Sequence, residues 1–215
     1  MLITDAVVET YAAGDFTLWP TAAPPADGLL PLSGRLSPSE TGTAMAVLAT
    51  YNKGERRRGA RDPEDAGELI RGLRATERVI APGGLRLTDT ATGVTAAPGC
   101  CVGLEDWRDW FGLANGEEPW LGHDPTPQVE HAGAIIRLWP DEDRGTARSI
   151  DIPRTRLPRL LGSVREDLAG FLACVDRWAA THVPSATASA LTEKLDEDWA
   201  VSAPLPEVPH GTPCG

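Results

Sequence analysis

The chain has 215 residues, of which 41% are hydrophobic and 24% charged, and its formal net charge at pH 7 is -11. This composition is typical of a globular protein and excludes a collagen, a coiled coil, a fully disordered chain and a disulfide-rich mini-protein. No apolar run approaches the ~20 residues that a membrane-spanning helix needs. The acidic balance argues against nucleic acid or a membrane as a partner and favours a protein with a basic surface.

Residues 1–75 are predicted to form an N-terminal helical and linker region. Apolar residues recur at helical spacing over 2–13, and Gly14 is a natural end for that helix. Five prolines in residues 20–38 predict a loop, with at most a short extended piece at 29–32.

Two further segments complete this region. The apolar run over 44–51 fits either a short helix or a buried strand, because its periodicity does not separate the two. Asp62, with Pro63 after it and acidic residues in the next positions, predicts the start of a helix that ends near Thr76.

Residues 76–181 are predicted to form an α+β core domain. Two short apolar stretches flank the Pro-Gly-Gly sequence at 82–84 and predict a tight hairpin. An extended stretch over 88–99 and a short helix over 104–111 follow. The sequence of this part therefore begins with strands and continues with a helix.

The second half of the core domain holds the clearest signals. A hairpin is expected around Gly133, followed by a strand at 149–152. A continuous apolar stripe then predicts a long helix over 158–180. The expected fold class is α+β: a small antiparallel sheet packed by a long C-terminal helix, with extra N-terminal helices.

The remaining residues, 182–215, are small, acidic or proline and predict a flexible tail. A short apolar pattern around Leu195 and Trp199 could serve as a docking segment within it. The start of the chain has no Lys or Arg before Arg35, which argues against a signal peptide and predicts a cytoplasmic protein.

Tryptophan and acidic residues concentrate in one part of the chain. Residues 87–143 carry a net charge of -9 and contain four of the seven tryptophans. Because tryptophan is costly to expose, such a cluster builds a core, lines a pocket or anchors an interface. The candidate partner-binding residues are Trp107, Trp110, Trp120, Trp139 and the acidic turn Asp141, Glu142 and Asp143.

A histidine and an aspartate are adjacent in a proline-rich loop. His123 and Asp124, with His131 a few residues later, form a conceivable zinc-binding set, while the prolines around them favour a rigid structural turn. Cys100 and Cys101 are also adjacent. Neighbouring residues of a strand point to opposite faces, so we expect ordinary thiols rather than a shared metal site. The alternative is that Cys100 or Cys101 is a further ligand of the histidine set. No catalytic residue is predicted.

Three stretches resemble known sequences: Pro98 to Arg108, Trp120 to Pro125, and Asp167 to Leu172. They resemble uncharacterised cytoplasmic proteins of actinobacteria, and their order is loosely similar to the SUKH superfamily of bacterial immunity proteins. The resemblance covers roughly residues 76–180. It implies a mixed sheet closed by a helix and a role in binding a toxin, and it supplies no catalytic residue.

Three functions are therefore hypotheses. The first is a non-enzymatic protein-binding module, an immunity or accessory factor with an acidic, tryptophan-rich surface. The second is a small metal-dependent enzyme or a metal-stabilised domain, with zinc at the His-Asp-Pro loop. The third is a scaffold component that docks through its C-terminal tail.

Overall fold

The computed structural model describes residues 1–13, 15–53, 65–142 and 148–206, and it contains two small antiparallel sheets. The first has the strand order β2-β1-β3-β4, formed by β1 (Leu2–Glu9), β2 (Leu29–Pro31), β3 (Gly83–Asp89) and β4 (Val94–Ala96). The second has the order β5-β6-β7, formed by β5 (Gln128–Ala132), β6 (Ile135–Trp139) and β7 (Ile150–Pro153).

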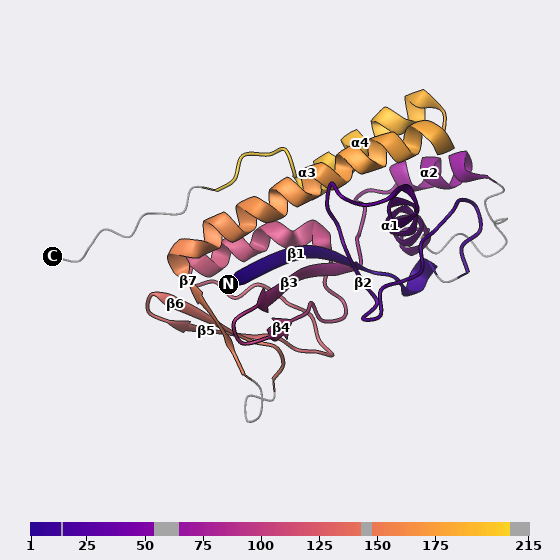
Figure 1. The fold of residues 1–215 in the computed structure, drawn as a ribbon. Helices are drawn as coiled ribbons and strands as arrows, with labels where there is room; N and C mark the ends of the chain where they lie inside the picture. Colours follow the sequence, from indigo (N-terminus) through magenta and orange to yellow (C-terminus); the bar gives the residue numbers. More distant parts are fainter. Residues whose placement is uncertain (14, 54–64, 143–147, 207–215) are drawn as a thin grey trace.

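Helices cover the first sheet. The α-helices are α1 (Pro38–Tyr51), α2 (Ala66–Arg74), α3 (Leu157–His182) and α4 (Ser185–Trp199). The 3₁₀ segments are η1 (Tyr11–Ala13), η2 (Leu104–Asn115) and η3 (Arg154–Arg156). α3 runs along the first sheet and packs on β1, and α4 returns beside it (Figure 1). Within the described ranges, no helix combines the length and the apolar character needed to cross a membrane.

The expected fold class is confirmed by this arrangement. α3 provides the apolar stripe that the sequence predicted, and its core positions include Leu161, Leu168 and Phe171, all 0% exposed. The hairpin around Gly133 is also confirmed, because β5 and β6 pair from Ala132 and Ile135 outward and the glycine has a φ of 61°. Both elements were predicted from local patterns, an apolar stripe for the helix and a glycine turn for the hairpin, which do not depend on residues distant in the sequence.

The expectation of a helix over residues 2–13 is wrong. Residues Leu2–Glu9 form β1, which pairs with β2 on one side and with β3 on the other. Strand β1 buries Ala6, Val7 and Val8 completely, so both of its faces are covered. A strand buried on both faces loses the simple alternation of apolar and polar residues, and its apolar positions can then mimic helical spacing.

The hairpin expected at 82–84 is wrong as well. β3 begins at Gly83 and pairs with β1, while β4 follows it in the expected extended stretch. Gly83 needs its missing side chain, because an added Cβ would lie 2.1 Å from the carbonyl oxygen of Val7. The glycine here allows close approach of two strands rather than a tight turn.

The apolar run over 44–51 belongs to α1, whose Ser37 cap and Glu40 form a reciprocal capping box. The next helix, α2, starts after Asp65, whose side chain accepts a hydrogen bond from the backbone N–H of Glu68. The expected start at Asp62 lies outside the described residues.

The stretch expected to be a flexible tail folds into α4 as far as Trp199. Leu191, Leu195 and Trp199 are each 0% exposed and recur every four residues along one face. The indole N–H of Trp199 donates to the carbonyl oxygen of Val79 at 3.1 Å. Leu195 and Trp199 are therefore core residues and are unavailable for docking to an outside partner.

A single hydrophobic core extends across the domain boundary expected at residue 75. Strands β1 and β2 come from residues 1–75, whereas β3 and β4 come from the following segment, and all four share one sheet. Buried residues of both segments and of α4 belong to the same cluster. The described residues thus share a core across the expected division.

Candidate functional site

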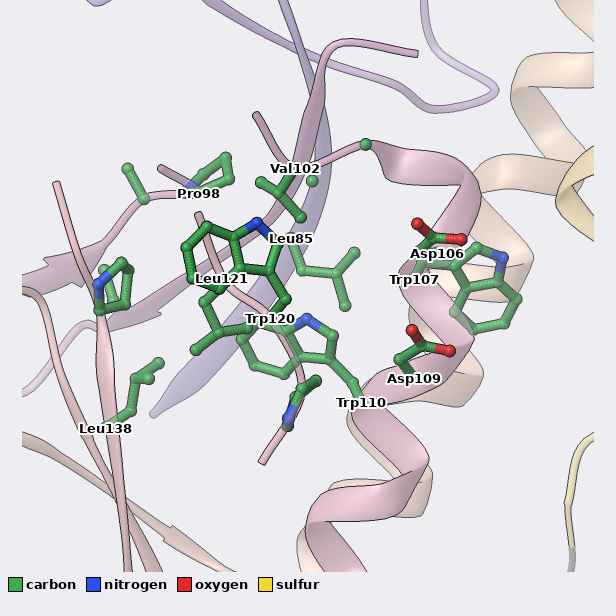
Figure 2. A pocket seen from close by; sticks show the side chains of 16 residues that line it. Leu85, Pro98, Val102, Asp106, Trp107, Asp109, Trp110, Trp120, Leu121 and Leu138 are labelled. Atoms are coloured by element: carbon green, nitrogen blue, oxygen red, sulfur yellow. The ribbon is translucent and has the colours of Figure 1, made fainter. Parts of the chain in front are cut away.

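A narrow apolar pocket lies between η2 and the loop that carries Trp120 (Figure 2). Its cavity volume is about 20 Å³, which is room for roughly one or two water molecules, so larger groups reach only its mouth. The first sheet, the second sheet and the loops between them all contribute to its wall. The main apolar side chains of that wall are Leu85, Pro98, Val102, Leu121 and Leu138.

One wall of the pocket is the face of η2 that carries Asp106, Asp109 and Trp110 (Figure 2). The two aspartates lie on the same side of η2 (Figure 2), although the backbone departs from helical geometry at Asp106, with φ -98° and ψ 15°. Trp110 is 8% exposed. Its ring contributes an aromatic surface to the pocket, and the surrounding core fixes the position of that ring.

The opposite wall carries Trp120, whose side chain is 62% exposed. Its indole N–H donates to the carbonyl oxygen of Cys101 at 3.3 Å, which orients the ring. An exposed tryptophan at the mouth of an apolar pocket is typical of binding sites, where such a ring becomes buried by a ligand.

The mouth of the pocket is acidic and only partly neutralised. Asp106 pairs with Arg78 at 2.8 Å between Oδ1 and Nη1. Asp109 makes no ion pair or hydrogen bond with any described residue. Partial burial, and then the neighbouring charge of Asp106, raise the pKa of Asp109, and Glu117 adds to this effect. A cation at this position would relieve the repulsion between these carboxylates.

A second cluster lies next to the loop that accepts the hydrogen bond of Trp120. The Sγ atoms of Cys100 and Cys101 are 3.2 Å apart, and both residues are exposed. His123 lies beside them, so that one ligand atom from each of the three residues falls within 4.8 Å of the others. Asp124 Oδ2 lies 3.1 Å from His123 Nδ1.

Hydrogen bonds in this cluster shift the pKa values of the two thiols in opposite directions. Hydrogen bonds from Cys100 and then from His123 lower the pKa of the Cys101 thiol. The same bond to Cys101 raises the pKa of Cys100, which keeps its proton. Asp124, and then Cys101, raise the pKa of His123. Cys101 is therefore the better nucleophile or ligand of the pair.

The structure separates His131 from the other members of the expected zinc set. His131 Nε2 lies 3.2 Å from the carbonyl oxygen of Glu117, and its Nδ1 lies 2.9 Å from Arg154 Nη2. Both ring nitrogens thus have protein partners. Among the described residues, the group of ligand atoms that lie close together is Cys100, Cys101 and His123, and it includes neither Asp124 nor His131.

The expected partner-binding residues also divide. Trp107, Trp110 and Trp120 all line the pocket. Trp107 is 1% exposed and donates from its indole to the carbonyl oxygen of Trp199 at 2.9 Å, so its assignment as a surface contact is wrong. Trp139 is half-buried at the end of β6, outside the set of residues that line the pocket.

Asp141 and Glu142 of the expected acidic turn are not among the residues that line the pocket. Asp141 Oδ1 accepts hydrogen bonds from the backbone N–H groups of Thr126 and Glu142, so this carboxylate has a structural role in the turn. Glu142 is exposed. Asp143 lies outside the described residues.

Sequence reasoning missed Asp106 and Asp109, which sit among the predicted tryptophans. Their spacing of three on a predicted helix was the available signal. It gave Cys100 and Cys101 only a secondary place in the metal hypothesis, because it treated them as neighbours in a strand. Gly99 and Gly122 let the two loops approach, but glycines in loops do not by themselves indicate which loops meet.

Comparison with known proteins gave no match for this chain, whether to protein-family models, to curated proteins or to solved structures.

Proposed function

We propose that this protein is a non-enzymatic protein-binding module that receives a basic side chain of its partner at the mouth of the pocket lined by Trp110 and Trp120. The observation that carries this proposal is that the exposed Trp120 and the carboxylate of Asp109, which makes no ion pair with a described residue, line the same apolar pocket. The resemblance to SUKH immunity proteins is part of the proposal, because members of that group act by binding.

The negative charges around the pocket determine which kind of partner side chain it favours. Asp109 makes no direct ion pair with a described residue. Burial, and then the charge of Asp106, raise the pKa of Asp109 by more than the charge of Arg78 lowers it, and Glu117 raises it further. Residues 87–143 carry a net charge of -9, so the surrounding surface attracts cations as well. A basic side chain is therefore the favoured occupant, and an acidic one is disfavoured by the same charges.

The shape of the pocket favours arginine over lysine. The pocket is narrow and its sides are indole rings, which a planar guanidinium can stack upon. The aliphatic stem of arginine can lie against the exposed ring of Trp120, while the head group remains near Asp109. Such an anchor is the kind of residue that dominates the binding energy of an interface.

The experiment is an NMR titration with three short capped peptides that differ only at the central residue: arginine, lysine or citrulline. Citrulline keeps the shape of arginine and lacks its charge. We expect the indole N–H signals of Trp110 and Trp120 to shift with the arginine peptide, less with lysine and least with citrulline. Higher salt should weaken the arginine shift, because screening reduces attraction between exposed charges.

Two variants make the test specific. Asp109→Asn should weaken the arginine peptide by about 1.5- to 5-fold, since an exposed ion pair contributes about 0.2–1 kcal/mol. Asp176→Asn, an exposed acid on α3, is the matched control and should leave binding unchanged. Equal shifts with arginine and citrulline, or shifts confined to residues outside the pocket, would contradict the proposal.

A further inference from the structure

Two cysteines and a histidine converge at an exposed point beside the Trp120 loop. Cys100 and Cys101 place their sulfurs 3.2 Å apart, and His123 completes a group whose ligand atoms lie within 4.8 Å of one another. Both cysteines are exposed, and the side chain of His123 is 46% exposed. The group is therefore accessible to an ion from solvent, and it lies outside the residues that line the pocket.

The backbone brings these residues together. Cys100 and His123 form a β-bridge in which each accepts a hydrogen bond from the N–H of the other. The approach depends on Gly99 and Gly122, because a Cβ on Gly99 would lie 2.5 Å from His123 N and one on Gly122 would lie 2.5 Å from the carbonyl carbon of Gly99. Two glycines thus hold the Cys-Cys turn against the histidine loop.

The conformation of Cys101 overcomes the usual objection to adjacent cysteines as ligands. Neighbouring residues in a strand point to opposite faces. Cys101 instead has a φ of 64°, in the left-handed region that non-glycine residues rarely adopt, and this turn directs both sulfurs to the same side. A strained residue that gathers reactive groups is a feature of functional sites rather than of plain turns.

A carboxylate orients the histidine. Asp124 Oδ2 lies 3.1 Å from His123 Nδ1. Metal-binding histidines generally donate their second ring N–H to a carboxylate or a carbonyl group, which fixes the tautomer and the direction of the ligand nitrogen. With Nδ1 engaged by Asp124, the ligand nitrogen of His123 is Nε2.

We propose that Cys100, Cys101 and His123 form a zinc site with an open fourth position. Two thiolates and an imidazole suit zinc, whereas magnesium and calcium prefer oxygen ligands. Tetrahedral zinc with bonds of about 2.3 Å to sulfur requires the two sulfurs to lie about 3.8 Å apart. The present separation of 3.2 Å is shorter by an amount that small side-chain rotations supply.

Zinc binding would also join two loops that flank the pocket. The ion would link Cys100 and Cys101 to His123, and the segment between them contains η2 and Trp120. Trp120 is already bonded to the carbonyl oxygen of Cys101. We therefore expect zinc to raise the thermal stability of the full-length protein, because an ion that binds only the folded state stabilises it by mass action.

The test uses the freshly reduced, full-length protein after chelator treatment, with cobalt(II) as a spectroscopic probe and zinc as its competitor. We expect one cobalt per chain, thiolate-to-cobalt charge-transfer absorption in the near ultraviolet, and the intense visible bands of tetrahedral cobalt. Zinc should displace the cobalt and raise the melting temperature. Cys100→Ser, Cys101→Ser and His123→Ala should each weaken binding by at least about tenfold.

Matched controls separate the site from general thiol chemistry. Cys214→Ser removes a cysteine outside the proposed ligand set, and His131→Asn removes a histidine outside it. Both should bind cobalt like the original protein. Asp124→Ala should weaken binding by roughly 10- to 100-fold without removing a ligand.

Three results would overturn the site. The reduced, folded protein could fail to bind either ion. Binding could survive the loss of His123 with an unchanged cobalt spectrum. Mass spectrometry after thiol alkylation could show that Cys100 and Cys101 resist reduction and remain joined as a disulfide. None of these results bears on the pocket, whose test uses peptides in the absence of added metal.

Discussion

Glu105 brings a carboxylate into the core at the start of η2. The residue is 6% exposed, and its Oε2 accepts a hydrogen bond from the backbone N–H of Ala81 at 2.9 Å. Burial raises the pKa of Glu105 more than this hydrogen bond lowers it. The folded protein therefore holds the proton of Glu105 more tightly than the unfolded chain does.

This shift predicts a pH-dependent difference between the original protein and Glu105→Gln. The contribution of a carboxyl with a raised pKa is most favourable below its unfolded pKa of about 4.3 and declines as the pH rises through its folded pKa. Glutamine keeps an oxygen for the N–H of Ala81 and carries no charge. The variant should therefore gain stability relative to the original protein as the pH rises from about 4 to 7.

The measurement is the free energy of unfolding in urea at a series of pH values. Glu166→Gln, which changes an exposed carboxylate on α3, controls for the loss of one surface charge. A difference between Glu105→Gln and the original protein that stays constant with pH, or that favours glutamate at higher pH, would contradict the burial argument.

Phe171 on α3 tests the packing of a single side chain. It is 0% exposed and stacks on Trp199, with ring centroids 6.0 Å apart and an angle of 11° between the planes. Phe171→Ala should lower the free energy of unfolding by roughly 3–5 kcal/mol, because it removes buried surface and leaves a cavity. Chemical denaturation measures this directly, with the exposed Arg159→Ala as the control. A loss below ~1 kcal/mol would place Phe171 outside the core.

At the scale of elements, local signals predicted α3 and the hairpin at Gly133, while β1 was assigned wrongly. The position of β1 depends on pairing with β3, and Leu2 lies opposite Asp89 in that register. Such pairing, together with the burial of both faces, overrides local periodicity. The fold class was therefore predictable, and the strand order was not.

The two candidate sites show the same dependence on distance in the sequence. Trp110 and Trp120 were predictable, because their residue type alone suggests a pocket or an interface. The meeting of Cys101 with His123 was not predictable, because it requires a left-handed turn and a close approach of two glycines. Sequence patterns report periodicity within an element and carry little information about how loops meet.

Helix α4 yields a prediction opposite to the one that a flexible tail would give. Its Trp199 is 0% exposed, donates to Val79 and accepts from the indole of Trp107. Trp199→Ala should cost about 3–5 kcal/mol of unfolding free energy, and a chain that ends at Pro184 should fail to fold. Thermal denaturation of Trp199→Ala beside the exposed Glu197→Ala gives the comparison. Equal melting temperatures for the two variants would show that α4 is dispensable.

The whole molecule combines a sheet of distant strands with helices from the C-terminal half. β1 lies between β2 and β3 and also packs on α3, so the earliest residues contact some of the latest. The second sheet joins the same hydrophobic cluster through Ile136, Leu138 and Ile152. Because neither half of the chain completes this core alone, the described elements should unfold together.

This coupling predicts a single unfolding transition, in which far-ultraviolet circular dichroism and tryptophan fluorescence change at the same urea concentration. Val8→Ala in β1 and Ile152→Ala in β7 remove fully or almost fully buried side chains from opposite ends of the core. Ile152→Ala should lower the free energy of unfolding by roughly 2–5 kcal/mol, and Val8→Ala should lower it by less. In each variant the midpoint of the one transition should move to lower urea with an unchanged slope. If Val8→Ala instead produced an early transition that left the fluorescence of the second sheet and η2 unaffected, the residues before 75 would form a separately folding unit.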